Sequence, residues 1–169
     1  MARQEKGQPS ITPGTRSLNE NLELALKDGT MRRAFRVKLT VRGGAASQAY
    51  SLDFLAAGDG TAECRFECRL SERKGESLRA SLSDKEFVSL LGSLRGALRL
   101  PEEQPRFLPD TLVGILEVGD GSSVRRLYFA ADVEQAKTQG KTPSPQLLRA
   151  LKAVYSTGAK LTGNRSIKP

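Results

Sequence analysis

The chain of 169 residues contains no histidine. This absence removes the usual general base near neutral pH, the commonest zinc ligand, and every catalytic pair in which a histidine activates a serine or a cysteine. Carboxylates or lysines can still perform chemistry, but no spacing in the sequence singles out a pair of them. We therefore expect a non-enzymatic protein that uses no metal and no cofactor.

Cysteine is also scarce: Cys64 and Cys68 are the two in the sequence, both within TAECRFECRL. That segment alternates as a strand with both cysteines on one face, and four residues of strand separate them by about 13 Å. A disulfide requires Cα atoms within about 7 Å of each other, so these two cannot be bridged. We interpret them as small buried apolar side chains in a reducing compartment.

Aromatic residues and long apolar runs are few as well. With six Phe, three Tyr and no Trp, the core is expected to consist mostly of Leu, Val and Ala. No segment approaches the roughly 20 apolar residues that a membrane span needs, and the polar start MARQEKGQPSITPGTR has no apolar run typical of a signal peptide. The predicted location is the cytoplasm, with no membrane partner.

The length is that of one ordinary domain. The prolines and glycines of the start predict a disordered N-terminal tail over 1–16. A single α+β domain is expected over 17–159, followed by a basic C-terminal tail over 160–169.

Four successive runs alternate apolar and polar residues, and short turns separate them. They cover 33–42, 48–55, 61–70 and 76–82. Short connections of this kind join antiparallel neighbours, so the runs predict an antiparallel β-meander. Matching apolar with apolar residues favours a register with Leu39 opposite Tyr50, which places Arg36 opposite Asp53 on the outer side. The same reasoning places Cys68 opposite Leu78 in the last pair.

Two helices begin with capping boxes, in which a serine is followed three residues later by a glutamate. Ser17 begins a short helix over 18–28. Ser83 begins an amphipathic helix that should lie across the inward face of the meander, where its glycines could allow close approach to the sheet. A third helix is predicted with Ser144 as its cap and Pro145 at its first position.

A second hairpin is predicted in TLVGILEVGDGSSVRRLYFAAD, with strands near 111–118 and 123–130. Its first strand has apolar residues at both its odd and its even positions, so apolar side chains point to both faces of the sheet. This pattern predicts a central strand covered on both faces. A short helical turn is expected after Asp132. The predicted order is α-ββββ-α-ββ-α, an α+β fold in which a meander and a second β-hairpin carry two or three helices packed mainly on one face.

Charge is the most informative functional feature. The net charge is +8, and the segments 31–44 and 135–169 carry basic residues without a single acid. In contrast, 101–120 is predominantly acidic. The molecule is therefore expected to have a basic pole and an acidic pole.

A basic stripe on a sheet is typical of contact with nucleic acid or another polyanion, because each phosphate neutralised releases counterions. The residues predicted to bind the polyanion are Arg32, Arg33, Arg36, Lys38, Arg42, Arg125, Arg126, Tyr128, Lys152, Lys160, Arg165 and Lys168. Among them Tyr128 is the aromatic residue expected to face outward for base stacking. The layout of four strands and a helix resembles the repeats of the PUR and Whirly families, which bind single strands.

Other interpretations use the same residues. Arginines and lysines on the first strand also protect an edge strand from pairing with other molecules, and Asp53 neutralises part of this charge. The alternative function is a structural or protein-interaction domain, which forms a homo-oligomer or docks an acidic partner. The polyanion hypothesis depends on whether the two acid-free segments meet in space.

Overall fold

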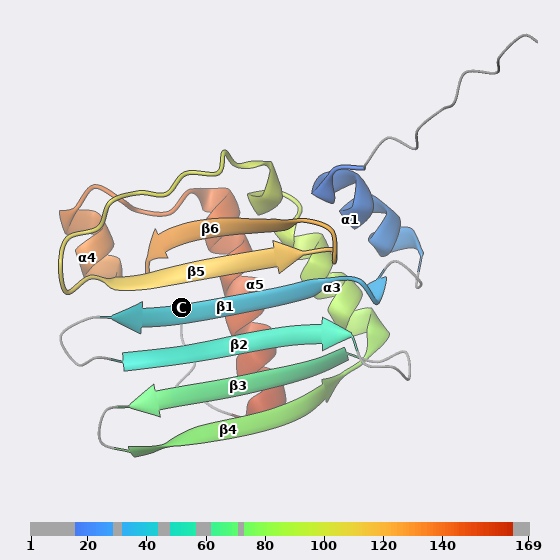
Figure 1. Ribbon diagram of the computed structural model, residues 1–169, viewed down its shortest axis with the longest axis horizontal. Helices are drawn as coiled ribbons and strands as arrows, with labels where there is room; N and C mark the ends of the chain where they lie inside the picture. The colour runs from blue at the N-terminus through green and yellow to red at the C-terminus, as the bar shows by residue number, and fades with distance from the viewer. Residues whose placement is uncertain (1–15, 29–31, 44–47, 57–61, 71–72, 164–169) are drawn as a thin grey trace, which may run out of the picture.

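The computed structural model describes residues 16–28, 32–43, 48–56, 62–70 and 73–163 (Figure 1). Its elements are α1 (Leu18–Lys27), β1 (Arg36–Gly43), β2 (Gln48–Ala56), β3 (Ala62–Leu70), β4 (Arg73–Leu82), α3 (Asp84–Leu94), the 3₁₀ helix η1 (Ala97–Arg99), β5 (Leu112–Gly119), β6 (Val124–Ala130), α4 (Val133–Thr138) and α5 (Pro145–Thr162). The predicted order α-ββββ-α-ββ-α is confirmed, and α4 is the short helix expected after Asp132.

The helices begin where the sequence predicts. Ser17 and Ser83 each accept a hydrogen bond from the backbone N–H three residues later, and the glutamate at that position accepts one from the serine backbone. These capping boxes satisfy donors that the first helical turn leaves unpaired. Ser144 caps α5, which continues through Thr162, beyond the expected domain boundary at residue 159.

All six strands form one antiparallel sheet in the order β4-β3-β2-β1-β5-β6. Strand β1 pairs with β2 on one side and with β5 on the other, so it lies in the interior of the sheet (Figure 1). The interpretation of β1 as a protected edge strand is therefore wrong. The second hairpin does not form a unit of its own, because it extends the meander through the pairing of β5 with β1.

The register of the meander differs from the expected one by two residues. Leu39 lies opposite Leu52 rather than Tyr50, and Cys68 lies opposite Glu76 rather than Leu78. A shift of two leaves every side chain on its own face, so alternation of apolar and polar residues cannot distinguish the two registers.

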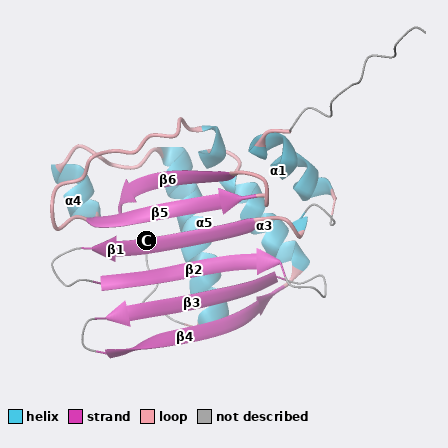
Figure 2. Ribbon diagram, in the orientation of Figure 1, coloured by secondary structure: helices cyan, strands magenta, loops and turns pink. Residues whose placement is uncertain are grey.

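The helices α3 and α5 pack against one face of the sheet (Figure 2). The central strand contributes Val37, Leu39 and Val41 to this side, and all three are 0% exposed. From the helix layer, Leu91 and Val154 join them in one continuous core. The expected position of the second helix over the inward face of the meander is thus confirmed. No described helix covers the opposite face of the sheet.

Strand β5 has the interior position that its apolar sequence predicted, but its expected coverage on both faces is wrong. Val113 and Ile115 lie on the side away from α3 and α5 and are half-buried. Their partial burial comes from neighbouring strand side chains such as Tyr128, which is opposite Ile115.

Gly92 of α3 and Gly96, which caps η1, do not approach the sheet, contrary to expectation. A Cβ added to Gly92 would meet Leu26 of α1 at 3.9 Å, and one added to Gly96 would meet Gln146 of α5 at 3.5 Å. The close approach to the sheet occurs instead at Gly158 of α5, where a Cβ would lie 2.7 Å from Leu52 Cδ2. Helix α5 can therefore lie directly on β2 because Gly158 has no side chain.

Cys64 is a buried free thiol on the inward face of β3, as predicted. Burial raises its pKa to about 12, which makes the thiol unreactive near neutral pH. The side chain of Cys68 lies outside the described residues. In the described part of the chain, no helix has both the length and the apolar character needed to cross a membrane.

Gly114 of β5 provides a test of how β5 and β6 pack against each other, because the ring of Phe129 of β6 lies over it. A Cβ at Gly114 would be 2.1 Å from Phe129 Cζ, so Gly114→Ala must displace a core ring. We expect a loss of about 1–3 kcal/mol in the free energy of unfolding, measured by urea titration.

Gly92→Ala is the matched control, because its new methyl group meets only ordinary contact distances inside a helix. It should raise the free energy of unfolding by about 0.5–1 kcal/mol. An unchanged urea midpoint for Gly114→Ala would contradict the packing described for β5 and β6.

Candidate nucleic-acid interface

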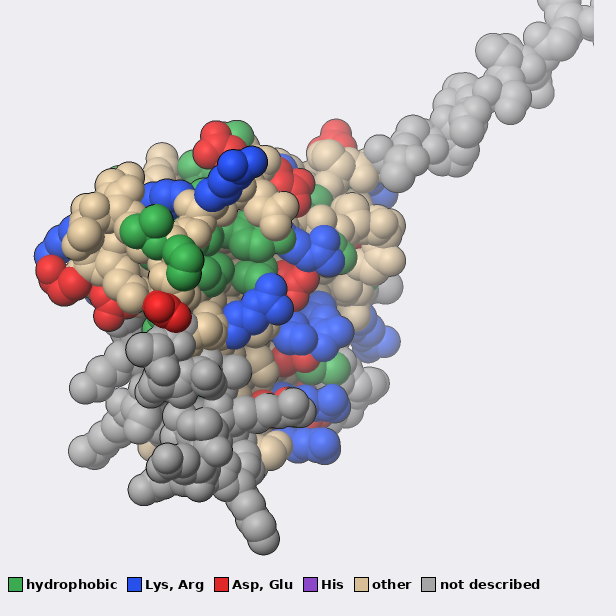
Figure 3. Space-filling view, turned by 60° about the vertical axis from the view of Figure 1, so that its left-hand side comes forward, with side chains coloured by type: hydrophobic (Ala, Val, Ile, Leu, Met, Phe, Trp, Pro, Cys, Tyr) green, Lys and Arg blue, Asp and Glu red, His purple; other side chains and the backbone are tan. Residues whose placement is uncertain are grey.

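The sheet face opposite α3 and α5 is here called the open face. On β1 it carries Arg36, Lys38, Thr40 and Arg42, which alternate with the buried apolar residues of the same strand. Blue basic and red acidic side chains are interspersed on this face, next to a group of green hydrophobic ones (Figure 3). The open face therefore combines side chains of both charges with a group of apolar side chains at one end.

One line of charged residues crosses the whole open face, with one residue from each strand. In sheet order this charged row is Arg79, Arg65, Asp53, Lys38, Glu117 and Arg126. Because neighbouring strands lie about 4.8 Å apart, the row is about 24 Å long. Four of its members are cations, and the two acids separate Lys38 from the arginines on either side.

The two acids of the charged row are engaged by arginines. Arg36 Nε donates to Asp53 Oδ1 at 2.8 Å, and its Nη2 group contacts Asp53 Oδ2. The hydrogen bond to Asp53 raises the pKa of Arg36 above its usual value. Arg36 reaches Asp53 diagonally, since the residue directly opposite Asp53 on β1 is Lys38.

On the other side of Lys38, Arg126 Nε donates to Glu117 Oε1 at 2.8 Å. Lys38 has Asp53 and Glu117 as its cross-strand neighbours, yet it forms no ion pair within 4 Å with any described residue. The charge of Lys38 therefore remains available to a ligand at the centre of the row.

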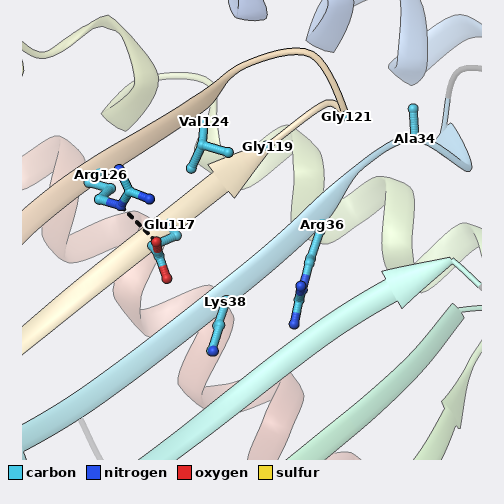
Figure 4. A pocket seen from close by; sticks show the side chains of 8 residues that line it. All are labelled: Ala34, Arg36, Lys38, Glu117, Gly119, Gly121, Val124 and Arg126. Atoms are coloured by element: carbon cyan, nitrogen blue, oxygen red, sulfur yellow. Dashed lines mark hydrogen bonds and ion pairs between the residues drawn. The ribbon is translucent and has the colours of Figure 1, made fainter.

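A pocket of about 340 Å³ lies next to the charged row (Figure 4). Its lining residues are Ala34, Arg36, Lys38, Glu117, Gly119, Gly121, Val124 and Arg126. Gly119 sits directly between Arg36 on β1 and Val124 on β6. Because Gly119 has no side chain, the sheet is hollow between these two neighbours.

A small apolar patch lies on the other side of the charged row, over β5 and β6. Ile115 is opposite Tyr128, and Val113 is opposite Ala130. Tyr128 is half-buried and lies on the open face, next to the row that contains Arg126. The open face thus combines cations with an aromatic ring.

Five of the residues predicted from sequence are brought together on the open face: Arg36, Lys38, Arg42, Arg126 and Tyr128. Arg33 is exposed just before β1. Lys152 and Lys160 are exposed on α5, in the helix layer behind the sheet, and Lys160 Nζ contacts Glu86 of α3 at 3.2 Å. The described cations of β1 and of α5 therefore lie on different sides of the sheet, so they do not converge, and a polyanion site would have to depend on the open face alone. Arg165 and Lys168 lie outside the described residues.

Two of the predicted arginines make structural contacts instead. Arg32 Nε donates to the carbonyl oxygen of Ala25 at 2.6 Å, and its Nη1 group contacts Asp84, so it connects α1 with α3. Arg125 lies on the inward face of β6 and donates to the carbonyl oxygen of Leu100. Its buried Nε has no hydrogen-bond partner among the described residues.

Sequence reasoning did not include Arg65 and Arg79 among the predicted binding residues. Both arginines alternate along their strands with buried residues such as Cys64 and Leu82. This alternation is visible in the sequence and could have placed them on the outward face. Their position beside Asp53 depends on the register, which the pattern alone does not determine.

The turn between β5 and β6 is held by Asp120, which is buried. Asp120 accepts hydrogen bonds from Asn21 Nδ2 of α1 at 2.7 Å and from the backbone N–H groups of Ser122 and Ser123 at 2.9 and 2.8 Å. Burial by itself would raise the pKa of Asp120, but these hydrogen bonds outweigh it and lower the pKa well below its usual value. This network positions the turn that contributes Gly121 to the pocket.

No family model matches the chain, and no curated protein matches its sequence. Within the described ranges, no group of three or more His, Cys, Asp or Glu residues is placed to hold a metal ion.

The Asp120 network can be tested through its pH dependence. Asp120→Ala should lower the free energy of unfolding by about 2 kcal/mol at pH 7, because buried donors lose a charged acceptor. The folded-state pKa of Asp120 lies below the reference value of 3.8, so its contribution is complete above about pH 4 and declines as the pH falls further. Urea titrations should show the difference between wild type and variant shrinking below pH 4.

Glu103→Ala removes an exposed carboxylate and serves as the control, with an expected change within about 0.5 kcal/mol at either pH. A difference between wild type and Asp120→Ala that grows on acidification would contradict the assignment of a lowered pKa to Asp120.

Proposed function

We propose that the protein is a non-catalytic domain that binds single-stranded nucleic acid across the open face. The observation that carries this proposal is the charged row, whose cations lie on a face that no described helix covers. Arg36 and Arg42 add positive charge on either side of Lys38. Phosphates bound along this face would release counterions, which is the main source of affinity in such complexes.

The paired arginines still support binding, because each pair leaves donors free. Arg126 uses Nε for Glu117 and has no hydrogen bond from either Nη group to a described residue. Arg36 uses Nε and Nη2 for Asp53, which leaves Nη1. A guanidinium held by a carboxylate on one edge presents its other edge in a fixed orientation, and this arrangement suits a phosphate.

The apolar patch favours a single strand over a duplex. Unpaired bases stack on aromatic side chains, whereas the bases of a duplex are already stacked on each other. Tyr128 and Ile115 offer such a surface beside the cations. A strand that follows the charged row would place phosphates near the cations and bases near Tyr128.

The prediction is that a fluorescently labelled single strand binds with strong salt dependence and that the open-face variant Lys38→Ala/Arg42→Ala reduces it. Both residues lack an ion pair with any described residue, so their removal leaves the fold intact. Loss of two phosphate contacts should flatten the slope of log K against log salt by about 1.4. Fluorescence anisotropy between about 50 and 200 mM salt measures this slope.

The matched control is Arg149→Ala/Lys152→Ala, which also removes one arginine and one lysine but from the exposed side of α5. Its slope should equal that of the wild type. An equal flattening of the slope in the two variants would mean that binding depends on the net charge of the protein rather than on the residues of the open face. A wild-type protein that fails to bind single strands at low salt would rule out the proposed function.

The order of charges in the row also favours a second candidate, self-association through the open face. In sheet order the signs are plus, plus, minus, plus, minus, plus. A second copy related by a two-fold axis parallel to the strands, between β1 and β2, would meet this row in reverse order. Lys38 would then face Asp53 of the other copy, and Arg65 would face Glu117, while Arg79 and Arg126 would oppose each other.

Sedimentation velocity separates this candidate from a monomeric binding domain. Self-association predicts a dimer that dissociates as salt is raised and that Lys38→Glu weakens, because the new carboxylate would face Asp53 of the other copy. The double variant Arg149→Ala/Lys152→Ala should leave the dimer unchanged. A protein that stays monomeric at all concentrations and salts would eliminate the second candidate.

A further inference from the structure

We infer that the pocket over Gly119 binds one nucleotide unit of the strand, with its phosphate near Lys38 and its base against Val124. This inference rests on the proposed function and specifies how one part of the open face would read its ligand. The pocket lies over β1, β5 and β6, where Lys38 and Arg126 of the charged row line it together with the apolar Val124 (Figure 4).

The size of the pocket agrees with a nucleotide. Its volume of about 340 Å³ lies within the range of about 300–1,000 Å³ that is typical of small-molecule sites. The hollow exists because of Gly119: a Cβ there would point into it, 3.1 Å from Val124 Cγ2.

The charges of the pocket favour an anion. Three cations, Arg36, Lys38 and Arg126, line it together with one acid, Glu117. Glu117 Oε1 already accepts from Arg126 Nε, so the donors that remain are Lys38 Nζ and the free Nη groups of the two arginines. Arg36 is held toward Asp53 of β2. The donors that can meet one phosphate here are therefore Lys38 Nζ of β1 and the Nη groups of Arg126 of β6, on the two strands that flank β5.

The apolar side of the pocket supplies the contact for a base. Val124 is 52% exposed, a large value for a valine within a strand, and it lies opposite Gly119 on β6. The flat guanidinium of Arg126 lies on the same strand, two residues away, and can stack on a base. Because inorganic phosphate has no base to contact Val124 and Arg126, it should bind more weakly than a nucleotide.

The experiment measures binding of adenosine 5′-monophosphate, adenosine and inorganic phosphate to the full chain by amide chemical shifts. The monophosphate should shift the amides of Lys38, Gly119 and Val124 and should displace a labelled strand. Lys38→Gln should weaken monophosphate binding by about tenfold, as expected for one lost charged hydrogen bond.

Arg42→Gln is the matched control, since Arg42 lies on the same strand and face, is exposed and does not line the pocket. It should leave monophosphate binding unchanged while still weakening the longer strand. Gly119→Ala places a methyl group on the pocket floor without changing the charge. Like Lys38→Gln, it should weaken the binding of the monophosphate, but it should leave the salt dependence of strand binding unchanged.

Equal effects of Lys38→Gln and Arg42→Gln on the monophosphate would overturn the pocket assignment, as would inorganic phosphate binding as tightly as the monophosphate. If the labelled strand binds and the monophosphate does not displace it, the pocket assignment fails while the proposed function stands. If the strand itself does not bind at low salt, both fail.

Discussion

The packing of α3 and α5 on a single face of the sheet is the constraint from which the rest of the structure follows. Val37, Leu39 and Val41 are 0% exposed beneath the helix layer, so the alternate residues of β1 must face the other way. A slip of one residue would bury Arg36 and Lys38 in an apolar core, at a cost far above the stability of a small domain. Burial on one face therefore holds the cations on the open face.

Stability and the candidate site are coupled through the turn between β5 and β6. Asp120 ties this turn to Asn21 of α1, and the same turn forms one wall of the pocket with Gly121. Glycines matter here for different physical reasons. Gly114 and Gly158 are required by close contacts of the core, whereas Gly119 leaves a hollow on the open face. A loss of the Asp120 network would disturb the pocket as well as the fold.

Prediction from sequence succeeded where local patterns are sufficient and failed where pairing partners matter. Alternation placed Arg36, Lys38 and Tyr128 on the outward side of their strands, but it could not choose between registers that differ by two residues. The contact between Arg36 and Asp53 was expected from the wrong register. It forms nonetheless, because an arginine side chain is long enough to reach a diagonal neighbour.

The sequence by itself determined the order of the elements, their caps and the face on which each strand residue lies, because these depend on neighbours close along the chain. Tertiary structure alone decided that β1 pairs with β5, which brings 36–43 against 112–119. That pairing places Lys38 next to Glu117 and Arg36 next to Gly119. The charged row and its pocket exist because of this long-range contact, which no local pattern encodes.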